Sequence, residues 1–168
     1  MARNRTIKEQ IDPWVYLGKP IESLEQMPDN TFGFVYLITS KNNGKKYVGK
    51  KAVKSIRYKI EYVEGKRPGR KKKVKVPVIS EARWQDYFGS GKEIIEAVKA
   101  EGKKSFVREI LRFVPTKKLL TYYELKEQCD RNVLEVDDYY NDNILAKFYR
   151  RDFINDDVEK SSEEEERN

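Results

Sequence analysis

The chain has 168 residues, of which 38% are hydrophobic and 38% charged, and a net charge of +7. This length suits one domain with extensions, and the basic balance favours a polyanionic partner such as nucleic acid. The absence of histidine excludes histidine-based hydrolase triads, HEXXH zinc sites and C2H2 zinc fingers. The single cysteine, Cys129, excludes an intrachain disulfide, and we expect it to be a small buried residue in a protein of the reducing cytoplasm.

Residues 1–31 are predicted to form an N-terminal extension. Neither a signal peptide nor a long apolar run is present, so no membrane partner is expected. Trp14 and Tyr16 have rings that can stack on bases, but large aromatic side chains more often pack against a core. We therefore expect both rings to pack on the domain.

Residues 34–50 are predicted to form a β-hairpin. Side chains alternate from Phe34 to Thr39 in the pattern of a strand. Asn43-Gly44 is a strong turn signal, because both residues tolerate positive φ. The return strand then places Tyr47 on the strand that neighbours Tyr36.

After the hairpin, residues 50–60 are predicted to form a short amphipathic helix, because Val53, Ile56 and Ile60 recur at helical spacing. A basic insert follows at residues 62–83, and its glycines and prolines predict a loop with a short ribbon at residues 74–79. Such a charge run can be a merely solvated surface. We favour contact with DNA phosphates. The basic side chains expected to make it are Lys66, Arg67, Arg70, Lys71, Lys72, Lys73 and Lys75.

The second half is predicted to read helix, strand, helix. Ser90 and Glu93 have the spacing of a capping box, so a helix should begin at Lys92, and Gly102 should end it. A strand over residues 106–114 and a helix over 117–131 follow. Residues 133–153 should wrap around the domain, and residues 154–168 should form an acidic, disordered tail.

The two tyrosine segments resemble the motifs of the GIY-YIG nuclease family. The segment from Phe34 to Tyr36 occupies the first motif, with phenylalanine where glycine is usual. The segment from Tyr47 to Gly49 occupies the second. The step of eleven residues between the tyrosines, and of ten more to Arg57, matches the family.

The resemblance covers residues 32–145, and its second half is similar to short phage-type, homing-endonuclease-like members. It implies an α+β fold with a three-stranded antiparallel sheet flanked by helices. On this basis we expect the nuclease-like domain to occupy residues 32–153, between the N-terminal extension and the acidic tail.

The resemblance also implies a hydrolytic site of tyrosine, arginine and glutamate. Glu124 takes the place of the family's metal-binding glutamate and would hold Mg²⁺ (or Mn²⁺); without the resemblance it would be interpreted as a surface carboxylate paired with a lysine. Arg57 would clamp the scissile phosphate. Tyr36 and Tyr47 would orient water and phosphate, although cross-strand packing also explains them.

Two further polar residues are candidates for DNA contact. Lys50 directly follows the second motif, where some relatives carry lysine. Asn143 best fits a family asparagine near the end of the core, and Asn141 is the alternative. Turn formation explains either asparagine equally well.

The general base is open between a tyrosine and metal-bound water. An unperturbed phenol has a pKa of about 10, so a tyrosine base needs a large downward shift of its pKa. Four residues after Arg57, where the family often has His or Tyr, this sequence has Glu61. Tyr58 or Tyr62 is a candidate to replace that group.

The resulting prediction is a magnesium-dependent endonuclease that hydrolyses double-stranded DNA in the cytoplasm, or in the host cytoplasm if it is phage-encoded. The alternatives are a non-catalytic nucleic-acid-binding protein on a nuclease-like fold and a structural interaction protein. No oligomeric state is predicted.

One site also requires a particular hairpin register. A strict two-residue turn at Asn43-Gly44 would pair Tyr47 with Ser40 and leave Tyr36 four residues away, about 13 Å along the strand. We therefore expect a wider loop that brings Tyr36 nearly opposite Tyr47.

Overall fold

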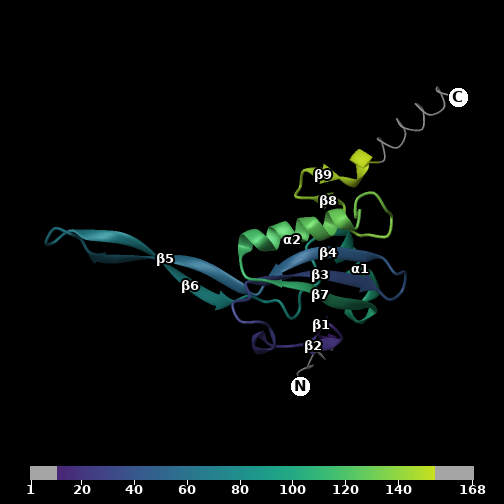
Figure 1. The fold of residues 1–168 in the computed structure, drawn as a ribbon, viewed down its shortest axis with the longest axis horizontal. Helices are drawn as coiled ribbons and strands as arrows, with labels where there is room; N and C mark the ends of the chain where they lie inside the picture. The colour runs from purple at the N-terminus through teal and green to yellow at the C-terminus, as the bar shows by residue number, and fades with distance from the viewer. Residues whose placement is uncertain (1–10, 154–168) are drawn as a thin grey trace, which may run out of the picture.

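The computed structural model describes residues 11–153; the predicted acidic tail, 154–168, lies outside the described residues. A five-stranded sheet in the order β2-β1-β7-β3-β4 carries the site, and a two-stranded ribbon, β5-β6, projects from one end of it (Figure 1). The strands are β1 (Trp14–Tyr16), β2 (Lys19–Ile21), β3 (Gly33–Ser40), β4 (Lys46–Ala52), β5 (Lys54–Glu64), β6 (Lys71–Glu81), β7 (Phe106–Val114), β8 (Asn143–Ile144) and β9 (Phe148–Tyr149). The helices are α1 (Lys92–Glu101) and α2 (Lys117–Asp130), with short 3₁₀ turns η1 (Leu24–Gln26) and η2 (Lys103–Ser105).

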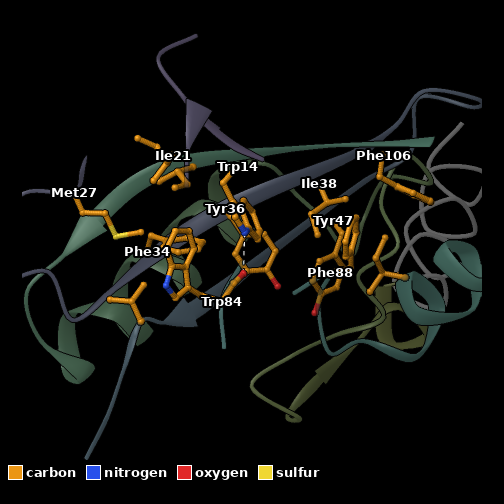
Figure 2. Close-up of a cluster of buried hydrophobic side chains, with 13 residues drawn as sticks. Trp14, Ile21, Met27, Phe34, Tyr36, Ile38, Tyr47, Trp84, Phe88 and Phe106 are labelled. Atoms are coloured by element: carbon orange, nitrogen blue, oxygen red, sulfur yellow. Dashed lines mark hydrogen bonds between the residues drawn. The ribbon is translucent and has the colours of Figure 1, made fainter. Parts of the chain in front are cut away.

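Strand β3 lies at the centre of the fold because both of its faces are apolar. Phe34, Tyr36 and Ile38 belong to one buried cluster, drawn in Figure 2 with Trp14, Trp84 and other aromatic side chains around them. The alternate residues Val35 and Leu37 belong to a second cluster, together with Leu120 of α2. The sheet is therefore covered on both faces, and α2 covers the second one.

The central strands β7, β3 and β4 are antiparallel, as expected. The prediction of only three strands is wrong, because β1 and β2 add to the sheet; β1 pairs in parallel with β7 at Val15 and Glu109. Trp14 fixes this addition: it is buried, and its indole N–H donates to the carbonyl of Trp84 at 2.9 Å. The expected packing of Trp14 on the domain is thus confirmed.

The β3-β4 hairpin has the wider loop that a shared site requires. The Ser40 N–H donates to the carbonyl of Lys45, which closes the loop. The register pairs Ile38 with Tyr47 and Tyr36 with Gly49. The two tyrosines are therefore diagonal neighbours on one face rather than directly opposite. Their ring centroids lie 6.2 Å apart, which brings both rings into one cluster.

Residues 50–83 differ most from expectation. The predicted helix at residues 50–60 is wrong, since β4 continues to Ala52 and β5 starts at Lys54. The predicted basic loop is wrong over most of its length, because β6 pairs with β5 over eleven residues and leaves only residues 65–70 as the turn. The short ribbon predicted at residues 74–79 does lie within β6. The reason lies in the sequence: Ile56, Tyr58, Ile60 and Tyr62 alternate at strand period and are β-branched or aromatic.

Helices α1 and α2 confirm their predicted positions, and Gly102 follows α1 with φ +83°. The Ser90 capping box is wrong, because the helix is preceded by Gly91 and no side chain caps it. Cys129 lies on the exposed side of α2, so its expected burial is also wrong. Within residues 11–153, no helix is long and apolar enough to cross a membrane.

Candidate active site

A cavity of about 430 Å³ lies along β4, one of the two edge strands of the sheet. Four parts of the chain line it: β4, the start of α1, the middle of α2 and residues 140–146. Four of the predicted site residues meet here. They are Tyr47, Lys50, Glu124 and Asn143.

Close packing against glycine fixes Tyr36 and Tyr47 beside this cavity. Tyr36 is only 1% exposed, and its hydroxyl lies where a side chain on Gly49 would have to be. A Cβ at Gly91 would stand 2.9 Å from the Tyr47 ring, closer than real Cβ atoms approach. The glycine that ends the Tyr-Val-Gly motif is therefore required by the ring across the strand.

Burial keeps both phenols neutral. Burial is the largest cause that raises the pKa of Tyr36 well above its usual value, with the nearby Tyr87 adding to the shift. Burial also raises the pKa of Tyr47, against hydrogen bonds from Ser90 and Gly91 that lower it. The Glu124 carboxylate raises the pKa of both phenols further. Each hydroxyl is thus a hydrogen-bonding group, not a ready phenolate, at neutral pH.

The raised pKa of Tyr36 makes stability depend on alkaline pH. Above about pH 10 the unfolded chain releases this proton while the folded chain retains it, so the free energy of unfolding falls by about 1.4 kcal/mol per pH unit per fully protected tyrosine. Between pH 8 and pH 11 the free energy of unfolding should fall by about 1 kcal/mol less in Tyr36→Phe than in the wild type. Urea unfolding at both pH values measures this.

Tyr122→Phe, at an exposed tyrosine on α2, is the matched control and should leave the alkaline loss unchanged. The interpretation of Tyr36 is wrong if both variants lose as much stability between the two pH values as the wild type does.

Glu124 and Lys50 form the charged centre of the cavity. Lys50 Nζ lies 2.7 Å from Glu124 Oε2, and the Glu124 side chain is 16% exposed. Lys50 also donates to the Thr121 hydroxyl at 3.1 Å. The lysine that pairs with Glu124 comes from β4, the strand that carries the second tyrosine motif.

The donor set can hold a divalent cation of the magnesium type. Mg²⁺ is bound in proteins by one or two carboxylates, with water and substrate phosphate completing its shell. Glu124 supplies one carboxylate at the cavity wall, where Glu93 and Asp142 are also found. No group of three or more acidic, cysteine or histidine side chains gathers for a metal within the described part of the chain, so the fit is to a site completed by substrate.

The two asparagine candidates differ in what they contact. Asn141 is buried; its amide accepts from Val48 N–H at 3.0 Å and donates to Val48 C=O at 2.8 Å. Asn141 therefore supplies hydrogen-bond partners to the backbone groups of Val48 on the open edge of β4. Asn143 is exposed, and its side chain accepts from Ala146 N–H at 3.1 Å, as in a turn. Both residues line the cavity.

Arg57 and the basic insert lie elsewhere. Arg57 is exposed on β5, opposite Val78, and does not line the cavity. The predicted phosphate-binding lysines and arginines of the insert occupy β6 and the turn of the ribbon. Figure 1 shows that the ribbon extends away from the sheet, so these cations are not part of the cavity wall.

Several residues at or near the cavity were not predicted. Ser90 and Lys92 line it, and Tyr87 packs edge-on against Tyr36 with ring centroids 6.0 Å apart. Lys51 Nζ lies 4.1 Å from the centre of the Tyr87 ring, and burial lowers the pKa of Lys51. The Tyr-x-Gly-Ser turn at residues 87–90 was the available signal.

This arrangement was compared with known proteins. Residues 14–144 match the family model described as "Putative endonuclease segE, GIY-YIG domain". The chain belongs to this segE GIY-YIG family. No curated protein and no solved structure matches it.

The segE match extends over nearly all of the described site. It begins at β1 and ends at β8, so it includes both tyrosine motifs, Glu124 and the strands that carry them. The resemblance noted from the two tyrosine segments is therefore confirmed at the level of the family. The roles of individual residues rest on the geometry described above.

Proposed function

We propose that this segE-family protein is a metal-dependent endonuclease that hydrolyses phosphodiester bonds of double-stranded DNA at the β4 cavity. One observation carries the proposal: Tyr47, Lys50 and Glu124, from the second motif strand and from α2, line a single cavity with Tyr36 directly behind. Hydrolysis of a phosphodiester needs an acceptor of the water proton, cationic support for the phosphorane and a donor to the leaving oxygen.

Lys50 is the proposed cation for the scissile phosphate. Its ammonium already faces the cavity and a carboxylate, and it is about one-third exposed. A phosphate entering the cavity offers it a second anionic partner at the same place. Arg57 remains a predicted clamp that would act only if the base of the ribbon moves toward the cavity.

Glu124 is the proposed ligand of Mg²⁺ or Mn²⁺. When bound, such an ion supplies positive charge at the phosphate and lowers the pKa of water. Glu124 Oε2 lies 2.7 Å from the Lys50 ammonium. The carboxylate and the ammonium thus hold each other in place before substrate arrives.

The tyrosines are proposed to position groups through hydrogen bonds. Because the pKa of each phenol is raised, each retains its proton. Tyr47 lines the cavity and can donate to a phosphate or leaving oxygen, whereas the buried Tyr36 packs behind it. In the hydrolytic step a water oxygen bonds to phosphorus and its proton passes to bulk water, while the bond to the leaving sugar oxygen breaks. That oxygen gains a proton from a donor, which bulk water then reprotonates. The Tyr47 hydroxyl, at the cavity wall, is the proposed donor.

One contact favours the non-catalytic alternative. The 2.7 Å ion pair between Lys50 and Glu124 satisfies both charges without metal or substrate, as a purely structural pair does. On that interpretation the protein would bind DNA without cutting it. Turnover separates the two functions.

The test is incubation of supercoiled plasmid with purified protein in Mg²⁺ and in EDTA. The proposal predicts nicked or linear plasmid only with the metal. DNA binding in both buffers with no cutting in either would establish the non-catalytic alternative. Cutting that persists in EDTA would contradict the metal dependence.

A further inference from the structure

The ribbon β5-β6 is long and lies outside the packed core. Eleven residue pairs join its strands, from Lys54 with Glu81 to Glu64 with Lys71. Every residue of the two strands is exposed or half-buried, so the ribbon adds nothing to either buried cluster. Such an arm, which projects clear of the sheet (Figure 1), needs a role outside the fold.

The ribbon carries the excess charge of the whole sequence. Residues 54–81 contain ten lysines and arginines and three glutamates, a net charge of +7. The net charge of the full chain is also +7, so the rest of the sequence is neutral in sum. A concentration of positive charge on one projecting element is the electrostatic pattern of nucleic-acid binding.

The same ribbon exposes apolar and aromatic side chains that water alone does not favour. Ile56, Tyr58, Ile60 and Tyr62 point to one face of β5, and each is at least 45% exposed. On the neighbouring strand Ile79, opposite Ile56, is 62% exposed. A contiguous apolar stripe with lysines beside it indicates a surface that is covered by a partner.

A second cavity connects the ribbon to the active site. It has a volume of about 510 Å³ and is lined by Lys51, Lys54 and Lys117, with Ile56 and Tyr58 of the ribbon. Lys50 lines this cavity and the active-site cavity alike. A basic surface therefore continues from the cutting site to the base of the ribbon.

We propose that the β5-β6 ribbon lies in the major groove of the duplex on one side of the cut, with the second cavity holding the phosphates between. The proposal rests on the function proposed above. The major groove of B-DNA is about 12 Å wide and admits a two-stranded β-ribbon. Eleven residues of strand span about 36 Å, close to the length of about 34 Å for one helical turn.

Duplex DNA fits the ribbon better than the other possible occupants do. A second copy would bring two ribbons of charge +7 together, which electrostatic repulsion opposes. Apolar side chains on the ribbon can contact thymine methyl groups in the groove, and lysines on the same strands can reach the phosphates that border it. A DNA duplex can therefore contact both the apolar side chains and the lysines of the ribbon.

Photo-crosslinking of wild-type protein tests the placement. A duplex of about 30 base pairs carrying 5-iodouracil in place of thymine puts the reactive atom where the thymine methyl group lies, in the major groove. In EDTA, which prevents metal-dependent cutting, irradiation should link the DNA to peptides from residues 54–81, with Tyr58 or Tyr62 as the modified residue. Links found only outside that range would overturn the proposal.

Salt dependence gives a second measurement that needs no metal. Replacing Lys71, Lys72, Lys73 and Lys75 with Gln should reduce the slope of log K against log salt by about 3 to 4. The matched control has the same charge change at exposed lysines away from the ribbon: Lys19, Lys99, Lys104 and Lys126. The control should change the slope by less than about 1, and equal changes in both variants would overturn the proposal.

These binding measurements separate failure of this proposal from failure of the proposed function. Ribbon cross-links without plasmid cutting would leave the groove contact standing and remove the nuclease assignment. Plasmid cutting with no ribbon cross-links would support the nuclease assignment and remove the groove contact. A protein that sediments as a dimer without DNA and forms no ribbon cross-links would assign the ribbon to self-association instead.

Discussion

Replacing Glu124 with glutamine is expected to lower the rate of DNA cleavage at least about 100-fold, the usual effect of losing one group that stabilises the transition state. DNA affinity should stay equal or become slightly tighter. The carboxylate repels phosphate, and its loss frees Lys50, which it holds at 2.7 Å. Fluorescence anisotropy in EDTA measures the affinity, and plasmid cleavage in Mg²⁺ measures the rate.

The variant should fold, because a partly exposed ion pair contributes no more than about 1 kcal/mol. Circular dichroism and the urea midpoint serve as the folding control. If affinity and cleavage fall by the same factor, Glu124 serves binding alone and the catalytic role is wrong.

Arg108→Met is expected to cost about 3 kcal/mol or more in unfolding free energy, the largest stability effect anticipated in the chain. Arg108 is 3% exposed. Its guanidinium lies 4.7 Å from the Trp14 ring centre and 4.3 Å from that of Phe88. It donates to the carbonyls of Gln85 at 2.7 Å and Tyr87 at 3.0 Å, and to that of Asp12. Methionine fills the space but leaves these carbonyls without their donors.

Arg112→Met is the matched control on the same strand. Arg112 is exposed and stacks on Tyr123 at 4.1 Å, so its loss should cost less than about 1 kcal/mol. Urea unfolding of both variants measures the two losses of unfolding free energy. Equal costs would mean that the Arg108 contacts add little to stability, and that the turn carrying Tyr87 is held by other interactions.

Local patterns in the sequence predicted most of the central fold. The alternation in β3, the periodicity of α1 and α2, and Gly102 after α1 each reflect local chemistry, and the structure confirms them. The parallel pairing of β1 with β7 joins residues far apart in the sequence. No local pattern carries that information, so the sheet was predicted with too few strands.

The ribbon was misread because two periods fit the same residues. Val53, Ile56 and Ile60 suit a helix, whereas Ile56, Tyr58, Ile60 and Tyr62 suit a strand. The pairing of β5 with the lysine-rich β6 decides between them. Glycine and proline marked the turn correctly at residues 65–70, but the predicted loop extended into the strand that follows.

The candidate site likewise contains residues that the sequence predicted and residues that it did not. The family resemblance predicted Tyr47, Lys50 and Glu124, which the fold brings to one cavity. Motif spacing also predicted Arg57, which the structure places on the ribbon strand β5 and not at the cavity. Ser90 was assigned to a helix cap, whereas it lines the same cavity as Tyr47. Such a placement depends on how the α1 turn packs on β4, which a linear pattern does not encode.

The central claim is that hydrolysis takes place at the Glu124 side of the β4 cavity. Single-turnover cleavage rates of Glu124→Gln and Glu127→Gln, at saturating protein in Mg²⁺, test it most directly. Glu127 is on the same helix but pairs with Arg131 and does not line the cavity. We predict a loss of at least about 100-fold for Glu124→Gln and a rate near that of the wild type for Glu127→Gln. Equal rates for the two variants would contradict the assignment.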